Sequence, residues 1–191
     1  LNSSTLPNPQ HRYSSVGPFA IKLIATSNNG CVDSVTKTQT NIYPQPKASI
    51  AAPAEVCWQT PVTFNSTATN GFTHPIVRWE WRFSDGTSST QQNPVKNFTA
   101  PGTYTATLWA FTDQNCVSDT VQHTVVVHPW PTAANSLSSP LCETNELTIT
   151  DNSAANVGSL VRWHWNFGDG TIVNQTAAAP VKHTYANWLS L

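Results

Sequence analysis

Four cysteines are the residues of this sequence whose type and spacing point most directly to chemistry. Cys31 and Cys116 are 85 positions apart, and so are Cys57 and Cys142. No two of them form a C-x-x-C pair, so neither a zinc site nor a thioredoxin-like redox centre is expected. An even number of cysteines in a chain rich in Ser, Thr and Asn is typical of disulfides formed outside the cytoplasm. We therefore expect extracellular disulfides rather than buried free thiols.

The ionisable residues do not form a pattern that catalysis requires. The six histidines show neither H-E-x-x-H nor another metal-ligand spacing, and no G-x-S-x-G motif is present. No acidic pair stands on a recognisable loop, as a glycosidase needs. Asp85 and Asp169 each stand alone in a tight turn, which favours a structural role over Ca²⁺ binding. We expect no enzyme activity, no metal and no cofactor.

The composition limits the classes of partner. Charged residues make up 10% of the chain and the net charge is −1, so nucleic acid and anionic membranes are not expected to bind. No apolar run approaches the ~20 residues of a membrane span. The chain contains no Met, even at position 1, which is typical of an internal fragment or a processed product. A signal peptide, if the protein has one, would lie upstream of Leu1.

The elements that must position these residues are short β-strands, because apolar and polar residues alternate with a period of two. Over residues 77–83, one face carries Val77, Trp79, Trp81 and Phe83, and the other carries Arg78, Glu80 and Arg82. Turn signals separate such runs, which indicates a β-sandwich. Residues 117–128 are predicted to form a long final strand. The expected core contains Val62, Phe64, Trp81, Phe83, Tyr104 and Leu108.

The sequence repeats itself with a period of about 85 residues. W-E-W-R-F-S-D-G-T over residues 79–87 returns as W-H-W-N-F-G-D-G-T over residues 163–171. Periods of this size indicate an array of small modules. The P-x-P sequences at 44–46 and 129–131 occupy matching places and are interpreted as stiff junctions. We predict the end of one module over 1–45, a complete module over 46–130 and the start of a third over 131–191. A half-module cannot bury both of its sheets.

These motifs resemble the PKD domain, a seven-stranded immunoglobulin-like sandwich. The resemblance rests on W-x-F-x-D-G-T at 81–87, Asn93-Pro94 and the G-x-Y-x-x-x-L run at 102–108, with partial copies in the outer modules. It implies an all-β chain of tandem immunoglobulin-like sandwiches. Ser84 in place of Gly, Phe19 in place of Tyr, and the residues after Tyr185 depart from the family pattern.

The repeated cysteines are similar to those in large surface proteins of Bacteroidota, which the type IX system exports and which often serve adhesion or gliding motility. The resemblance implies a non-enzymatic stalk or spacer at the cell surface or outside the cell. Its partners would be neighbouring repeats of the same chain, surface glycans or other surface proteins, or further copies packed laterally. The alternatives are an accessory, carbohydrate-engaging segment of a secreted polysaccharidase or protease, and a subunit of a surface layer or fibre.

Within this family topology the two cysteines of one module would lie at opposite ends of the sandwich. A strand of six or seven residues spans ~20 Å, whereas a disulfide needs Cα atoms within ~7 Å. Bridges between neighbouring modules are therefore favoured over Cys57–Cys116. Cys57 would then pair with a cysteine beyond Leu191, and Cys116 with one before Leu1.

Two surface features are candidate sites. Trp109 and Phe111 are out of phase with the core and are expected to lie outward beside Arg78 and Glu80. There the two aromatic side chains would either contact a glycan or protein or only cover the sheet. Trp130 is interpreted as a wedge between modules. By the resemblance to Bacteroidota proteins, the motifs at 33–35 and 119–121 imply O-glycosylation at Ser34 and Thr120. The alternative for both motifs is ordinary strand alternation.

Overall fold

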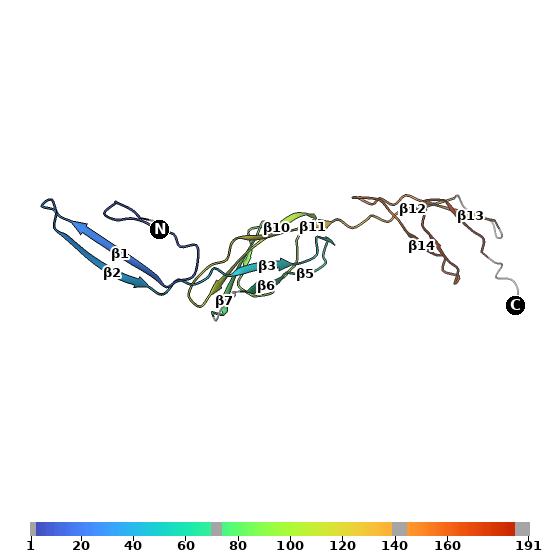
Figure 1. Cartoon of the computed structure of the whole chain (residues 1–191). Coiled ribbons are helices and arrows are strands. Elements are labelled where there is room, and N and C mark those ends of the chain that lie inside the picture. The colour runs from blue at the N-terminus through green and yellow to red at the C-terminus, as the bar shows by residue number, and fades with distance from the viewer. Residues whose placement is uncertain (1–2, 70–73, 139–144, 186–191) are drawn as a thin grey trace. The chain divides into compact units, whose positions relative to one another are not determined.

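The structure is a computed structural model that describes residues 3–69, 74–138 and 145–185. Every regular element among these residues is a β-strand (Figure 1), so the chain is all-β, as predicted. The chain divides into two compact units, residues 1–54, 62–96 and 104–125, and residues 55–61, 97–103 and 126–191. The predicted boundaries at 45 and 130 stay predictions.

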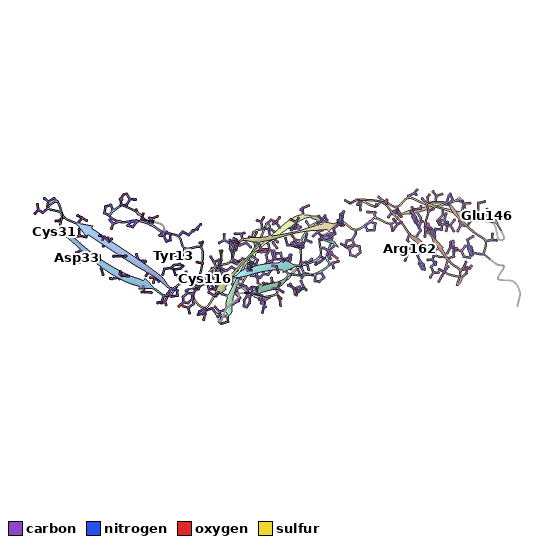
Figure 2. All side chains as sticks on the ribbon, in the orientation of Figure 1. Tyr13, Cys31, Asp33, Cys116, Glu146 and Arg162 are labelled. Atoms are coloured by element: carbon purple, nitrogen blue, oxygen red, sulfur yellow. The ribbon has the colours of Figure 1, made fainter. Side chains whose placement is uncertain are left out.

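The first two strands form an isolated antiparallel hairpin. β1 (Phe19–Thr26) pairs with β2 (Val32–Gln39), from Phe19 opposite Gln39 to Thr26 opposite Val32. A short turn joins them, and Cys31 lies in it (Figure 2). Apart from the half-buried Phe19, every side chain of this hairpin is exposed. The ring of Tyr13 stacks on Phe19 with 4.5 Å between centroids.

The middle of the chain forms one large sheet and two small ones. The five-stranded sheet has the order β4-β11-β10-β7-β8, and the pairs β3-β6 and β5-β9 form the others. The strands are β3 (Lys47–Ala51), β4 (Glu55–Cys57), β5 (Val62–Thr63), β6 (Asn65–Thr69), β7 (Ile76–Phe83), β8 (Ser88–Ser89), β9 (Val95–Lys96), β10 (Gly102–Thr112) and β11 (Val121–His128).

The core of this region is aromatic at its centre. Phe64 lies 5.9 Å from Trp81 and 5.3 Å from Phe83, measured between ring centroids. Trp81 is 1% exposed, and its Nε1–H donates to the Gln91 carbonyl at 2.9 Å, which satisfies the polar atom of a buried indole. Five of the six predicted core residues are buried, namely Val62, Phe64, Trp81, Phe83 and Leu108. Tyr104, the sixth, is half-buried.

Two sequence predictions in this region are wrong. Val77 was predicted to share the inner face of Trp81, but it is 56% exposed. The pairing of β10 with β7 shifts register between Phe111 and Thr112, and Thr112 then pairs with Ile76. Such a bulge turns the residue at the irregularity out of alternation. The final strand also begins at Val121 rather than at residue 117, because residues 113–120 form the preceding loop.

The last part of the chain contains two further sheets. One has the order β12-β13-β16 and the other pairs β14 with β15. A small core forms from Ile149, Phe167 and Val181, with Trp165 packed against it. The strands are β12 (Asn135–Leu137), β13 (Leu147–Asp151), β14 (Trp163–Asn166), β15 (Ile172–Gln175) and β16 (Val181–His183).

Candidate functional site

The predicted aromatic surface lies on two neighbouring strands. In the antiparallel pairing of β10 with β7, Trp109 is opposite Glu80 and Phe111 is opposite Arg78. Alternation places these four residues on the sheet face away from Trp81 and Leu108. Both aromatic side chains are half-buried, whereas Arg78 is exposed. The structure therefore brings together all four residues that the sequence proposed for this surface.

Two arginines lie over the two rings. The guanidinium carbon of Arg78 is 3.5 Å from the centroid of Phe111, and that of Arg82 is 5.6 Å from the centroid of Trp109. Arg78 is also paired with Glu80. Cation–π contacts at exposed sites contribute about 0.5–1 kcal/mol each. These contacts place a charged group over each half-buried ring, so the surface combines aromatic rings with charged groups. We refer to residues 78, 80, 82, 109 and 111 as the aromatic–arginine surface.

Thr120 adjoins this surface. Its Oγ1 accepts a hydrogen bond from Trp109 Nε1 at 3.0 Å. The neighbouring Asp119 accepts a hydrogen bond from Gln45 Nε2 at 3.0 Å. In the sequence, the Thr120 motif and Trp109 stand apart as separate features. Their proximity was detectable in principle, because a strand, a short loop and a returning strand place residues on either side of the loop next to each other.

The matching motif at residues 33–35 has a different neighbour. Ser34 lies in β2 opposite Ile24, and its backbone N–H donates to Asp33 Oδ1 at 2.8 Å. Ile24 is 85 positions before Trp109. An indole thus accompanies the hydroxyl of Thr120 but not that of Ser34. O-glycosylation of Ser34 and Thr120 stays a prediction.

The three cysteines among the described residues lie at the end of a strand or in the loop beside one. Cys31, Cys57 and Cys116 are free thiols, and Cys142 lies outside the described residues. Cys57 ends β4 and pairs with His128, the last residue of β11. Cys116 comes before the start of β11. The eight residues of β11 correspond to ~26 Å at ~3.3 Å per residue, so this register does not suit a Cys57–Cys116 bridge.

Each acidic turn residue accepts hydrogen bonds from within its own turn. Asp85 Oδ1 accepts hydrogen bonds from the N–H of Thr87 at 3.1 Å and from its Oγ1 at 2.7 Å, and Lys96 Nζ lies 2.7 Å from Asp85 Oδ2. Partial burial works to raise the pKa of Asp85. The hydrogen bonds from Lys96 and Thr87 and the charge of Lys96 outweigh it and lower that pKa below its ordinary value of 3.8. Gly86 follows at a φ of 84°, which glycine adopts without strain.

The second copy of the turn has the same design, with a histidine in the place of the lysine. The N–H of Thr171 donates to Asp169 Oδ1 at 2.9 Å, and His183 Nε2 lies 2.7 Å from Asp169 Oδ2. The backbone hydrogen bond from Thr171 is the main cause of the lowered pKa of Asp169. Within the described residues no group of three or more His, Cys, Asp or Glu is placed to hold a metal ion. In the same part of the chain, no helix has the length and apolarity to cross a membrane.

Comparison with known families identifies the middle of the chain. Residues 43–127 match the family model described as the PKD domain. The chain carries a PKD domain at these residues. This domain contains the aromatic–arginine surface, the aromatic core around Trp81 and the turn at Asp85.

Solved structures similar to the chain include two PKD domains from Vibrio. The PKD1 domain of Vibrio anguillarum Epp has 21% sequence identity and a TM-score of 0.40, with 45% of this chain and 96% of that chain covered. The PKD1 domain of the Vibrio cholerae metalloprotease PrtV has 28% identity and a TM-score of 0.39, with coverages of 44% and 98%. The fibronectin(III)-like modules of Clostridium thermocellum CbhA have 16% identity and a TM-score of 0.41, with coverages of 61% and 65%.

Proposed function

We propose that this chain is a non-enzymatic segment of an extracellular repeat array that acts as a stalk or spacer in a large surface adhesin or filament. The 85-residue period and the PKD domain support a modular array. The repeated cysteines further favour a surface protein of the Bacteroidota type, exported by the type IX system and used in adhesion or gliding.

The observation that carries the proposal is the parallel pairing of β4 with β11. Val126 is opposite Glu55, Val127 opposite Val56 and His128 opposite Cys57. The N–H of Trp58 extends this ladder by donating to the His128 carbonyl at 2.7 Å. Tension applied to the two ends of the chain pulls parallel strands along their length in opposite directions. The hydrogen bonds then bear the load together rather than opening one at a time, which suits a stalk.

Single-molecule force spectroscopy on the full chain tests this role. Trp58→Pro removes the N–H that donates to His128, whereas Trp58→Ala removes the same indole and keeps the N–H. We expect the unfolding force of the PKD domain to be lower for Trp58→Pro than for Trp58→Ala. Equal unfolding forces for the two variants would contradict a mechanical role for this ladder.

The absence of enzyme activity is part of the proposal and is tested separately. Purified chain is incubated with peptide and polysaccharide substrates, and cleavage is followed by mass spectrometry. Hydrolysis that a single substitution within residues 1–191 abolishes would overturn the assignment as a passive segment.

A second candidate function is an accessory, carbohydrate-engaging segment of a secreted polysaccharidase or protease. The aromatic–arginine surface favours it, because flat rings flanked by charged groups suit stacking and hydrogen bonding to sugars. Arg78 lies over Phe111 and Arg82 over Trp109, so a ligand at this surface would meet aromatic rings and cations together. The binding measurement described in the Discussion separates a binding segment from a simple spacer.

A further inference from the structure

Two strands in different modules have free edges that match each other. β1 lies 85 positions before part of β10, and β14 lies 84 positions after part of β7. In the middle region β10 and β7 pair with each other. Among the described residues, β1 pairs only with β2, and β14 pairs only with β15. The edges that join the two strands in the complete domain are therefore both open, and open edges are templates for pairing with another chain.

The side chains beside these edges are also uncovered. Leu23 is 60% exposed and Ile21 is 50% exposed, whereas their counterparts Leu108 and Ala106 are 0% and 1% exposed. The difference arises because β10 packs its inner face on a core, and β1 has none to pack on. β1 thus presents the apolar face of a core strand to solvent.

The last sheets contain the complementary space. An open cavity of about 450 Å³ is lined by residues of both sheets, among them Asn135, Asp151, Trp163 and Trp165. In the PKD domain the counterpart of Trp163 is Trp79, which is opposite the fully buried Ala110 of β10. The cavity is therefore open on the side where the complete domain has the strand equivalent to β1.

We propose that the β1–β2 hairpin of one chain docks on β14 of a second copy and completes its sandwich. The register follows from the pairing of β10 with β7: Ile21 opposite Phe167, Leu23 opposite Trp165 and Ala25 opposite Trp163. The partner is a second copy because the hairpin and its acceptor are parts of one repeat. Each chain carries one hairpin and one acceptor, so the contact is heterologous and generates open, end-to-end assemblies.

Sedimentation of the full chain over a wide range of concentration tests the association. We expect the mass to rise with concentration. Leu23→Asp places a charge on the inner face and should weaken association by ~30-fold or more. Ile24→Asp makes the same change at a neighbouring residue that is 56% exposed and lies on the outer face. It should leave association unchanged.

A cross-link tests the register. Thr107 is opposite Arg82 in the PKD domain, which predicts that Lys22 of one copy is opposite Asn166 of the next. Lys22→Cys combined with Asn166→Cys should form a disulfide that links isotopically different chains in a mixed sample. Lys22→Cys combined with Asn174→Cys, on the neighbouring strand β15, should not form one.

Three results overturn the proposal. The first is a chain that stays monomeric at every concentration. The second is self-association that Leu23→Asp and Ile24→Asp affect equally. The third is an assembly in which peptide mapping finds no link between positions 22 and 166. The melting transition of the PKD domain, followed by near-ultraviolet circular dichroism, confirms that both aspartate variants are folded.

Discussion

Trp109 Nε1 donates a hydrogen bond to Thr120 Oγ1 at 3.0 Å. This contact links the only Trp on the outer face of β10 to the hydroxyl of an Asp-Thr-Val motif on the other side of a loop. An ether oxygen accepts a hydrogen bond as a hydroxyl oxygen does. A sugar attached to Thr120 is therefore compatible with this bond and would begin beside the indole. The contact joins the two candidate surface sites into one region.

Truncation of Trp109 should remove binding at the aromatic–arginine surface. A glycan array identifies a ligand of the full chain, and titration of that ligand measures the affinity of each variant. We expect Trp109→Ala to weaken binding by ~30-fold, because a central aromatic anchor contributes about 2 kcal/mol or more. Trp130→Ala is the control, since Trp130 is an exposed Trp outside this surface. Unchanged affinity of Trp109→Ala would show that the rings only cover the sheet.

Modification of Thr120 should be visible as an added mass. Protein is isolated from its natural producer, and the peptide containing residues 119–121 is analysed by mass spectrometry. We expect a glycan mass that Thr120→Ala removes and Ser34→Ala leaves in place. An unmodified Thr120 peptide in the native protein would mean that the motif reflects only the ordinary alternation of residues along a strand.

Truncation of Trp81 should destabilise the PKD domain strongly. Trp81 is 1% exposed and contacts Phe64 and Phe83, so Trp81→Ala leaves a large cavity and should lower the free energy of unfolding by ~3–5 kcal/mol. Trp109→Ala, at a half-buried position of the same domain, should cost less. Chemical denaturation of both variants measures the difference, and a larger effect of Trp109→Ala would contradict the observed core.

The pair of Asp85 and Lys96 should make stability depend on pH. The pKa of Asp85 is lowered in the folded state below its ordinary value of 3.8, so the folded protein favours the ionised carboxylate. The resulting stabilisation is present above pH 3.8 and is lost as the pH falls through the lowered pKa. Asp85→Asn should therefore be less stable than the wild type at neutral pH, and the two should converge in acid. Thermal melts at several pH values test this, and a constant difference would contradict it.

The cysteines of one module should not bridge to each other. Cys57 is level with the end of β11, and Cys116 precedes its start. In a longer tandem array we expect bridges between neighbouring modules, found by peptide mapping under non-reducing conditions. A Cys57–Cys116 peptide would show that the loop before β11 folds further along the sheet than the register indicates.

Alternation in the sequence predicted the inner face of the PKD domain well. Trp81, Phe83 and Leu108 are buried as expected, because each lies in a regular stretch where successive side chains point to opposite faces. Val77 failed because it is the extra residue of the register shift: Phe111 and Thr112 pair with Arg78 and Ile76, so Val77 is left unpaired in β7 and the alternation does not continue through it. The candidate surface around Trp109 was predicted by the same alternation, but the arginines over its rings were not.

The sequence by itself determined the repeat, the all-β class and most of the inward-facing side chains of the PKD domain, since these depend on local patterns along the chain. Tertiary structure decided that β4 pairs in parallel with β11, that Arg78 lies over Phe111 and that Thr120 meets Trp109. These features depend on contacts between residues far apart in the chain, and such contacts follow from how the strands pair and pack rather than from any local pattern.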